Sequence, residues 1–252
     1  RRRRIWRHTA PANSSGAVSR PLKWPGAVCR QILRRRGVHI GGHILEIAGV
    51  RDTAFDPVGV GAAQLDRLAA VPFSLIDPAA EAPMRERVED ARRTLDSVGG
   101  IVEAAAAGLP GGLGSPMFAG VENRLAPLLF GIPAVKGLEF GEGFGFARLR
   151  GSEANDPYAP GPDGGVTATA NHNGGVLGGI TNGMPLLVRA VIKPTSSISQ
   201  PQQTVNLQTG QAETLEVHGR HDPCIVPRAL PVIEAALAVG LLDLMESEPL
   251  GR

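Results

Sequence analysis

The residues best suited to chemistry lie together near the carboxyl end, in the run HGRHDPC at 218–224. It places His218, Arg220, His221 and Asp222 within five consecutive residues, directly before a rigid proline. The guanidinium of Arg220 can hold a carboxylate or a phosphate with its fork of donors. Asp222 and His221 can move protons. The Cys and His spacing matches no zinc pattern, so we predict no metal site; a solvated charged turn is the alternative.

A second run with chemical potential is KPTSSI at 193–198. Lys193 brings a cation, and Thr195, Ser196 and Ser197 bring hydroxyl groups beside consecutive backbone N–H donors. Together these groups predict a pocket for an anion. The alternative is a turn started by Pro194, with Lys193 as a solvated surface charge.

Two glycine-rich runs can bring backbone close to a ligand, GLPGGLGSP at 108–116 and NHNGGVLGGITNGMP at 171–185. The first lacks the Lys-Ser or Lys-Thr ending of a phosphate-binding P-loop, so tight turns explain its glycines better. In the second run, a loop packed against a flat ligand and a bulged hairpin explain the glycines equally well.

Hydrophobic periodicity predicts the elements that must position these runs. We expect helices over 27–38, 79–98, 121–132 and 227–245, and strands over 38–50, 134–144, 186–193 and 203–217, with a further strand in the run that begins at Gly99. The stretch 56–77 is expected to be loop-rich because prolines interrupt it. Strands and helices that mix without regular alternation predict an α+β fold.

Composition excludes several classes of protein. With 252 residues, of which 42% are hydrophobic and 20% charged, the chain can form a packed core. Aromatic residues make up only 4%, which argues against a surface that stacks nucleic-acid bases. The two cysteines cannot form a disulfide scaffold and fit a reducing compartment, and no apolar run is long enough to span a membrane. We therefore expect a cytoplasmic protein that binds neither nucleic acid nor membrane.

The amino-terminal segment is unusual. Residues 1–36 hold 11 Lys or Arg and no acidic residue, whereas the remaining 216 hold 15 basic and 24 acidic residues. A basic arm before an acidic body is one pattern of a nucleic-acid tail. Residues 1–25 show no clear period, however, and we interpret them as an aberrant segment, separate from a domain over 26–252.

Taken in order, six runs resemble the chorismate synthase family: GSPMF, AVKGLEFGEGF, LRGSEANDP, GGVLGGITNGMP, KPTSSI and GRHDPCIVPRA. The resemblance covers residue 26 to about residue 245, and GRHDPC and the stretch from GGVLGG to KPTSS are highly specific to the family. It implies an α+β fold with a β-sandwich core and flanking helices. It also implies a carbon–oxygen lyase that converts 5-enolpyruvylshikimate 3-phosphate into chorismate by anti 1,4-elimination of phosphate.

The resemblance further implies a need for reduced FMN, obtained from a flavin reductase or by reduction with NADPH, and a homotetramer. The implied flavin contacts are Ala134, Gly178, Lys193, Pro194, Thr195, Ser196, Ser197 and Arg220. Asp222 matches the carboxylate that takes a proton from flavin N5, and Arg220 also lies beside the substrate. Residues 171–173 lie near the site in this resemblance, and Cys224 is a packed thiol without a chemical role.

The sequence also departs from the family pattern. The family's G-E-S-H-G-like motif and a second catalytic histidine are absent, so 26–252 corresponds to its carboxyl-terminal two-thirds. The stretch before Gly26 reads ANSSGAVSRPLKWP in place of a motif that contributes to flavin and substrate binding. One interpretation is a reading-frame slip, since codons for Ser-Gly-Arg-Leu with one inserted G can be read as Ser-Gly-Ala-Val, as at 15–18. The alternative function is a non-catalytic relative that retains part of a flavin or anion site.

Overall fold

The structure is a computed structural model that describes residues 14–161, 165–219 and 221–247, with side chains from residue 22 onward. Its helices are α1 (Ser14–Arg35), α2 (Ala62–Leu68), η3 (Pro78–Ala80), α3 (Glu81–Arg93), α4 (Val121–Phe130), η4 (Gly143–Arg148), α5 (Gly151–Ala154) and α6 (Val226–Ser247). Its strands are β1 (His39–Ile47), β2 (Val50–Arg51), β3 (Gly100–Ala107), β4 (Val135–Phe140), β5 (Tyr158–Pro160), β6 (Val166–Ala168), β7 (Val176–Leu177), β8 (Ile180–Thr181), β9 (Leu186–Ile192), β10 (Gln202–Val205) and β11 (Ala212–Leu215). The predicted α+β class is confirmed.

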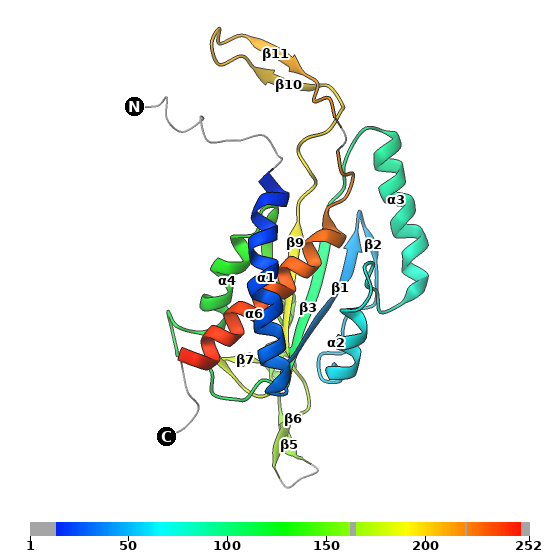
Figure 1. Cartoon of the computed structure of the whole chain (residues 1–252). Coiled ribbons are helices and arrows are strands. Elements are labelled where there is room, and N and C mark those ends of the chain that lie inside the picture. The colour runs from blue at the N-terminus through cyan, green and yellow to red at the C-terminus, as the bar shows by residue number, and fades with distance from the viewer. Residues whose placement is uncertain (1–13, 162–164, 220, 248–252) are drawn as a thin grey trace.

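Five strands form the central sheet, in the order β2-β1-β3-β9-β4, and every neighbouring pair is antiparallel. The remaining strands form three two-stranded hairpins. The β10–β11 hairpin projects beyond one end of the central sheet, and the β5–β6 hairpin projects beyond the other end (Figure 1). The single long strand expected over 203–217 is therefore wrong, because residues 206–211 turn the chain back on itself.

Alternate residues of the central strands face opposite sides of the sheet, as the two-residue period of a strand requires. Val102, Ala104 and Ala106 of β3 belong to the main core, together with the apolar residues of α4 and α6. Ala105 and Ala107 belong to a second cluster that includes Leu65 and Leu68 of α2. The helix α2 lies inside the stretch expected to be loop-rich, so that expectation was wrong for these seven residues.

Helices α1 and α6 pack together over the sheet, with α6 in contact with β1 and β3 (Figure 1). Helix α1 begins at Ser14, well before the predicted start at residue 27. Among the described residues, no helix combines the length and the apolar character that crossing a bilayer requires.

The crossing of α1 and α6 depends on Gly26. A Cβ atom at this position would lie 2.4 Å from Cβ of Ala235 and 2.7 Å from its Cα, both closer than atoms can pack. We expect Gly26→Val to lower the free energy of unfolding by about 1–3 kcal/mol, the range for overpacking. Ala27→Val, at the exposed neighbouring position, is the matched control and should change it by less than about 0.5 kcal/mol. Urea unfolding followed by circular dichroism measures both; equal effects would contradict the close approach.

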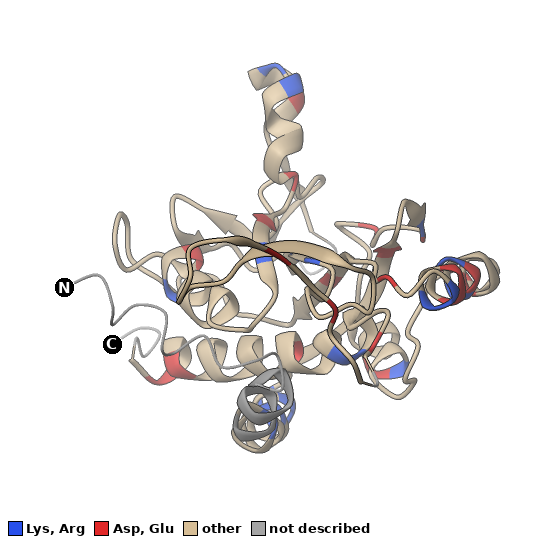
Figure 2. Ribbon diagram, turned by 90° about the horizontal axis from the view of Figure 1, so that it is seen from above, with Lys and Arg blue, Asp and Glu red and all other residues tan. Residues whose placement is uncertain are grey.

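Helix α3 ends earlier than expected. It stops at Arg93, and Leu95 follows with a φ of +59° and an exposed side chain, so the helix does not continue to residue 98. Acidic and basic residues are both present on α3, which lies at the edge of the fold (Figure 2). Met84 is fully buried while Arg85, Arg87 and Glu89 are exposed, so α3 packs one face against the fold and turns a charged face to solvent.

Candidate functional site

Several segments meet at the end of the sheet where β9 finishes. Ile192, the last residue of β9, lies opposite Gly100 at the start of β3 and Val135 at the start of β4. The segments that follow β9 and precede β3 and β4 therefore share one end of the sheet, uppermost in Figure 1. Val98 donates its N–H to the carbonyl of Pro223 over 2.8 Å, which brings in the segment before α6. We call this end the Lys193 rim; it comprises residues 97–99, 134, 193–197 and 222–224.

Two short hydrogen bonds hold the segment after β9 in place. The N–H of Lys193 donates to the carbonyl of Ala134 over 2.9 Å, and the hydroxyl of Ser97 donates to the carbonyl of Thr195 over 2.6 Å. Ala134 adopts a φ of +77°, in the left-handed region that favours glycine. Strained backbone of this kind is concentrated at functional sites. The structure thus joins predicted site residues that are about 60 positions apart in the sequence.

The polar groups of this segment are largely unused. The Thr195 hydroxyl oxygen Oγ1 is buried and has no hydrogen-bond partner among the described residues, and such a group costs free energy unless a ligand or water satisfies it. Within the described part of the chain, the N–H groups of Thr195, Ser196 and Ser197 donate to no protein acceptor. The ammonium of Lys193 contacts only the carbonyl of its neighbour Pro194, at 3.1 Å, among those residues. A cation, hydroxyls and free N–H donors in one short segment can bind an anionic or polar ligand.

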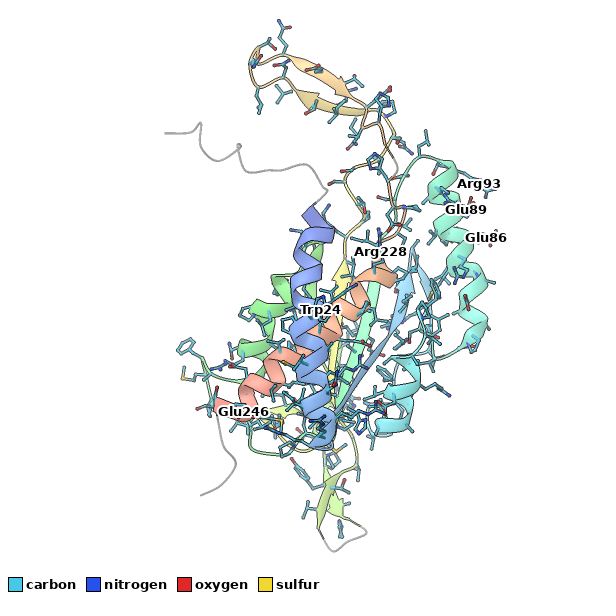
Figure 3. The ribbon with its side chains drawn as sticks, viewed as in Figure 1. Trp24, Glu86, Glu89, Arg93, Arg228 and Glu246 are labelled. Carbon is cyan, nitrogen blue, oxygen red and sulfur yellow. The ribbon has the colours of Figure 1, made fainter. Side chains whose placement is uncertain are left out.

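Asp222 lies on the same rim, and its side chain is 29% exposed. Its Oδ1 accepts the N–H of Cys224 over 3.1 Å, and its Oδ2 pairs with the guanidinium of Arg228. Arg228 belongs to the first turn of α6, at the rim end of the molecule (Figure 3). His221 Nε2 lies 3.2 Å from a backbone carbonyl oxygen four residues earlier. Arg220, predicted to bind both flavin and substrate, lies outside the described residues.

Gly178 is the predicted site residue that the structure leaves apart from the others. It occupies the turn between β7 and β8, where it is exposed and has a φ of +60°. This turn lies near the start of β9, since Leu187 donates to the carbonyl of Gly174 in the same glycine-rich run. One chain therefore does not bring Gly178 to the Lys193 rim, which lies at the other end of β9.

The motif at 171–173 lies with Gly178, and Asp156 organises it. The Asp156 carboxylate accepts hydrogen bonds from the N–H groups of His172 and Asn173, from the Asn173 amide over 2.8 Å and from His172 Nδ1 over 3.0 Å. Burial alone would raise the pKa of Asp156, but these hydrogen bonds lower it below its ordinary value. Asn171 is buried, and its side chain accepts the N–H of Gly175 and donates to the carbonyl of Pro185, the last residue of the glycine-rich run.

Two adjoining cavities lie between α1, α2 and α6, with volumes of about 530 and 460 Å³. Lys23 and Glu234 line both cavities. Arg228, which pairs with Asp222, lines the smaller one. Burial raises the pKa of Glu234, although Arg30 pairs with its Oε2 over 2.9 Å. Within the described residues, no group of three His, Cys, Asp or Glu side chains is arranged to hold a metal ion.

Sequence reasoning missed several residues that shape this region. Gly99 is required on the rim, because a Cβ there would lie 2.9 Å from Cδ of Pro194. Arg228 and Asp156 were also missed, since no local pattern shows that they pair with Asp222 and the 171–173 motif. Burial raises the pKa of the Cys224 thiol, which disfavours the nucleophilic thiolate and agrees with the packed role expected for it.

Comparisons with known proteins agree with these observations. The sequence profile of the chorismate synthase family matches residues 7–245. A protein named chorismate synthase from Chloroflexus aggregans is 44% identical over 250 residues, covering 99% of this chain and 65% of that protein. One with the same name from Methanothermobacter thermautotrophicus is 43% identical over 220 residues, covering 87% of this chain and 58% of that protein. A solved structure titled "Crystal Structure of Chorismate Synthase" superposes with a TM-score of 0.74 at 26% identity, covering 91% of this chain and 63% of that one.

The chain thus spans 65% of the length of its Chloroflexus relative. The profile match begins at residue 7 and so extends into the segment 1–25, whose separate status stays a prediction. The match over nearly the whole described chain, together with the identities of 43–44%, establishes the family. The chain belongs to the chorismate synthase family.

Proposed function

We propose that this chain takes part in the chorismate synthase reaction, the anti 1,4-elimination of phosphate from 5-enolpyruvylshikimate 3-phosphate to give chorismate. In this reaction a C–O bond to phosphate and a C–H bond break, and a second ring double bond forms. The observation that carries the proposal is the Lys193 rim. It gathers at one end of the sheet the Lys193 ammonium, Asp222 and the buried Thr195 hydroxyl, which has no partner among the described residues. These groups fit a ligand that carries phosphate and polar ring edges.

Reduced FMN is the cofactor that we propose for the rim. Lys193, with the hydroxyl and N–H groups of residues 195–197, would hold its polar atoms, and the Thr195 hydroxyl would gain a partner that the described residues do not supply. Pro194 and the backbone of Ala134, with its φ of +77°, would contribute further contacts to it. When bound, reduced FMN supplies transient electron density for the departure of phosphate.

Asp222 and Arg220 are the residues to which we assign the chemistry. The Asp222 carboxylate would accept a proton from flavin N5, and its partial exposure leaves it accessible from the rim. Arg220, two residues earlier, would grip an anionic group of the substrate with its fork of donors. The leaving phosphate and the two carboxylates of the substrate require several cations. Lys23 and Arg228, the latter paired with Asp222, line the smaller cavity and would supply two of them.

A homotetramer is the assembly that we propose, in the cytoplasm, with either NADPH or a flavin reductase as the source of reducing equivalents. The position of Gly178 supports an assembly of several copies. One chain holds Gly178 and the Lys193 rim at opposite ends of β9, so a second copy is the expected source of a Gly178 contact at the rim.

Two measurements test this function. In an anaerobic assay with chemically reduced FMN and 5-enolpyruvylshikimate 3-phosphate, we expect the 252-residue chain to form chorismate. Absence of both turnover and flavin binding would overturn the proposal. Turnover without any added flavin would overturn the cofactor.

Flavin binding should depend on Lys193 and Thr195. We expect Lys193→Gln to weaken binding about tenfold or more, because it removes a charge-assisted hydrogen bond, and Thr195→Val to weaken it by a smaller factor. Lys136→Gln is the matched control, since Lys136 is an exposed lysine on the neighbouring strand β4 and lies off the rim. Titration of flavin fluorescence measures all three. Equal affinities for Lys193→Gln and Lys136→Gln would contradict the assignment.

A further inference from the structure

A row of charged side chains crosses the interior of the central sheet. His43 of β1 lies directly opposite Glu103 of β3, Glu103 lies opposite Arg189 of β9, and Arg189 lies opposite Glu139 of β4. His43 Nε2 is 3.0 Å from Glu103 Oε2, Arg189 Nε is 2.9 Å from Glu103 Oε1, and Arg189 Nη1 is 3.4 Å from Glu139 Oε2. We call these four residues the charged rung.

His43 is the buried centre of this arrangement. Its side chain is 0% exposed, and its ring forms a T-shaped contact with the ring of Phe55 at a centroid distance of 4.8 Å. The second ring nitrogen, Nδ1, lies 2.8 Å from Oδ2 of Asp52, a residue just after β2 whose side chain is also fully buried. Both nitrogens of the imidazole therefore face carboxylate oxygens.

Counting hydrogen bonds shows where the proton lies. A neutral imidazole has one N–H, so one of its two nitrogens would point a lone pair at a carboxylate oxygen. That clash is removed only if His43 is protonated or if one of the carboxyl groups is. The other contacts of the two carboxyl groups decide between these arrangements.

Both carboxyl groups are surrounded by donors, as an ionised carboxylate requires. Asp52 also accepts the N–H groups of Thr53, Ile76 and Asp77, over 2.7–2.9 Å. Glu103 also accepts the N–H of Phe55 over 2.7 Å, besides the guanidinium of Arg189. A carboxyl group that accepts this many hydrogen bonds stays ionised. The extra proton therefore belongs to the ring.

We propose that His43 is held as an imidazolium across the neutral pH range and acts as a positioning residue for the glycine-rich run 171–185. This inference does not rest on the proposed reaction. The charged groups that face the ring are Asp52 and Glu103 directly, with Arg189 and Glu139 beyond Glu103.

The direction of the pKa shifts agrees with this geometry. Burial alone would lower the pKa of His43, but the hydrogen bonds to Asp52 and Glu103 raise it above its ordinary value of about 6.5. Burial would likewise raise the pKa values of Asp52 and Glu103, but the hydrogen bonds from His43 and the backbone lower both.

Hydrogen bonds and one short stretch of backbone lead from His43 to the glycine-rich run. Through Asp52 and Glu103 the imidazolium fixes the backbone from residue 53 to Phe55. Two residues later the carbonyl of Pro57 accepts the Asn171 side-chain amide over 2.8 Å. Asn171 in turn accepts the N–H of Gly175 over 2.6 Å. Loss of the imidazolium would thus release the loop that supports Asn171.

Nuclear magnetic resonance of the unsubstituted chain with labelled histidine tests the protonation state. We expect both His43 ring nitrogens to keep the chemical shifts of an imidazolium between pH 6 and pH 8. The other described histidines, His39, His172, His218 and His221, can be removed one at a time to assign the signals. A His43 signal that titrates near 6.5, or that shows one neutral tautomer at pH 7, would overturn the proposal.

Amide hydrogen exchange tests the positioning role. In His43→Gln we expect the amides of Phe55 and Gly175 to lose about tenfold or more of their protection, while α6 keeps its own. His39→Gln is the matched control, because His39 is on the same strand and pairs with Asp66 near the surface. Unchanged protection of Gly175 in His43→Gln would refute the positioning role.

If His43→Gln does not fold, the unsubstituted chain still decides the question. As the pH rises through the titration of His43, protection of Phe55 and Gly175, corrected for intrinsic exchange rates, should fall before that of α6. Simultaneous loss in all three regions would show that His43 serves the whole fold and not the glycine-rich run.

Discussion

Replacing Glu103 with glutamine is expected to lower the free energy of unfolding by about 3–5 kcal/mol, the range for breaking a buried ion pair by removing one partner. Glu103 is 1% exposed and is the only described side chain that contacts both His43 and Arg189. Glutamine has nearly the same shape but no charge, and its amide group would place a donor against one of the two cations. Since domains of this size are stable by only about 5–15 kcal/mol, much of the stability would be lost.

Glu139→Gln is the matched control for this prediction. Glu139 lies at the end of the charged rung, its side chain is 25% exposed, and its contact with Arg189 is longer, at 3.4 Å. We expect its substitution to cost about 1 kcal/mol or less, as for partly exposed ion pairs. Urea unfolding at pH 7, followed by circular dichroism, compares the two variants. A similar loss of unfolding free energy in both variants would mean that the burial of Glu103 does not make its ion pairs more important for stability than the partly exposed pair of Glu139.

The pH dependence of stability should carry the same signature. His43 has a raised pKa in the folded chain, so its contribution is complete below about pH 6.5 and is lost as the pH rises through the folded value. Asp52 and Glu103 have lowered pKa values, so their contributions are present above their ordinary values near pH 4 and are lost as the pH falls through the folded ones. The charged rung and Asp52 therefore stabilise the chain most between about pH 4 and pH 6.5. In Glu103→Gln the free energy of unfolding should change less with pH on both the acidic and the alkaline side of this range.

Periodicity predicted the elements that are long and strongly patterned. The apolar run at 227–245 is the helix Val226–Ser247, and the run at 186–193 is the strand Leu186–Ile192, each within two residues of the expected bounds. Helix α2 escaped prediction because it has only seven residues, too few to be stable by local propensity. Packing of its leucines against the small residues of β3 stabilises it, and that contact is not visible in the local sequence.

In the candidate site, too, some residues could be predicted from the sequence and others could not. KPTSSI and HDPC were found because their polar groups are adjacent in the sequence, and the end of β9 then brings them to one rim. The charged rung was missed because His43, Glu103 and Arg189 are 60 and 86 residues apart, and only strand register aligns them. The available signal was one charged residue in the middle of each of the otherwise apolar runs GIVEAAAA and LLVRAVI. A charge that interrupts such a strand requires a partner on the strand beside it.

Asp222→Asn is expected to reduce the rate of chorismate formation by about 10²- to 10⁴-fold, the usual contribution of a positioned general acid or base. An asparagine oxygen can still accept the N–H of Cys224, which keeps the turn before α6 intact. Asparagine loses the ability to take up a proton and the charge that pairs with Arg228, while the groups that we propose to hold the flavin are unchanged, so flavin affinity should stay close to that of the unsubstituted chain.

Asp243→Asn is the matched control, because Asp243 is an exposed aspartate of α6 that pairs with Arg124 of α4, and its loss should leave the rate unchanged. Arg228→Gln separates proton transfer from placement of the carboxylate. If Arg228 only orients Asp222, Arg228→Gln should reduce the rate of chorismate formation by a smaller factor than Asp222→Asn. The pH dependence of the rate should then be displaced but still present. A full rate in Asp222→Asn, measured anaerobically with reduced FMN, would remove Asp222 from the chemistry. The proton would then have to be accepted by another group near the Lys193 rim, and His221, the residue before Asp222, is the first candidate.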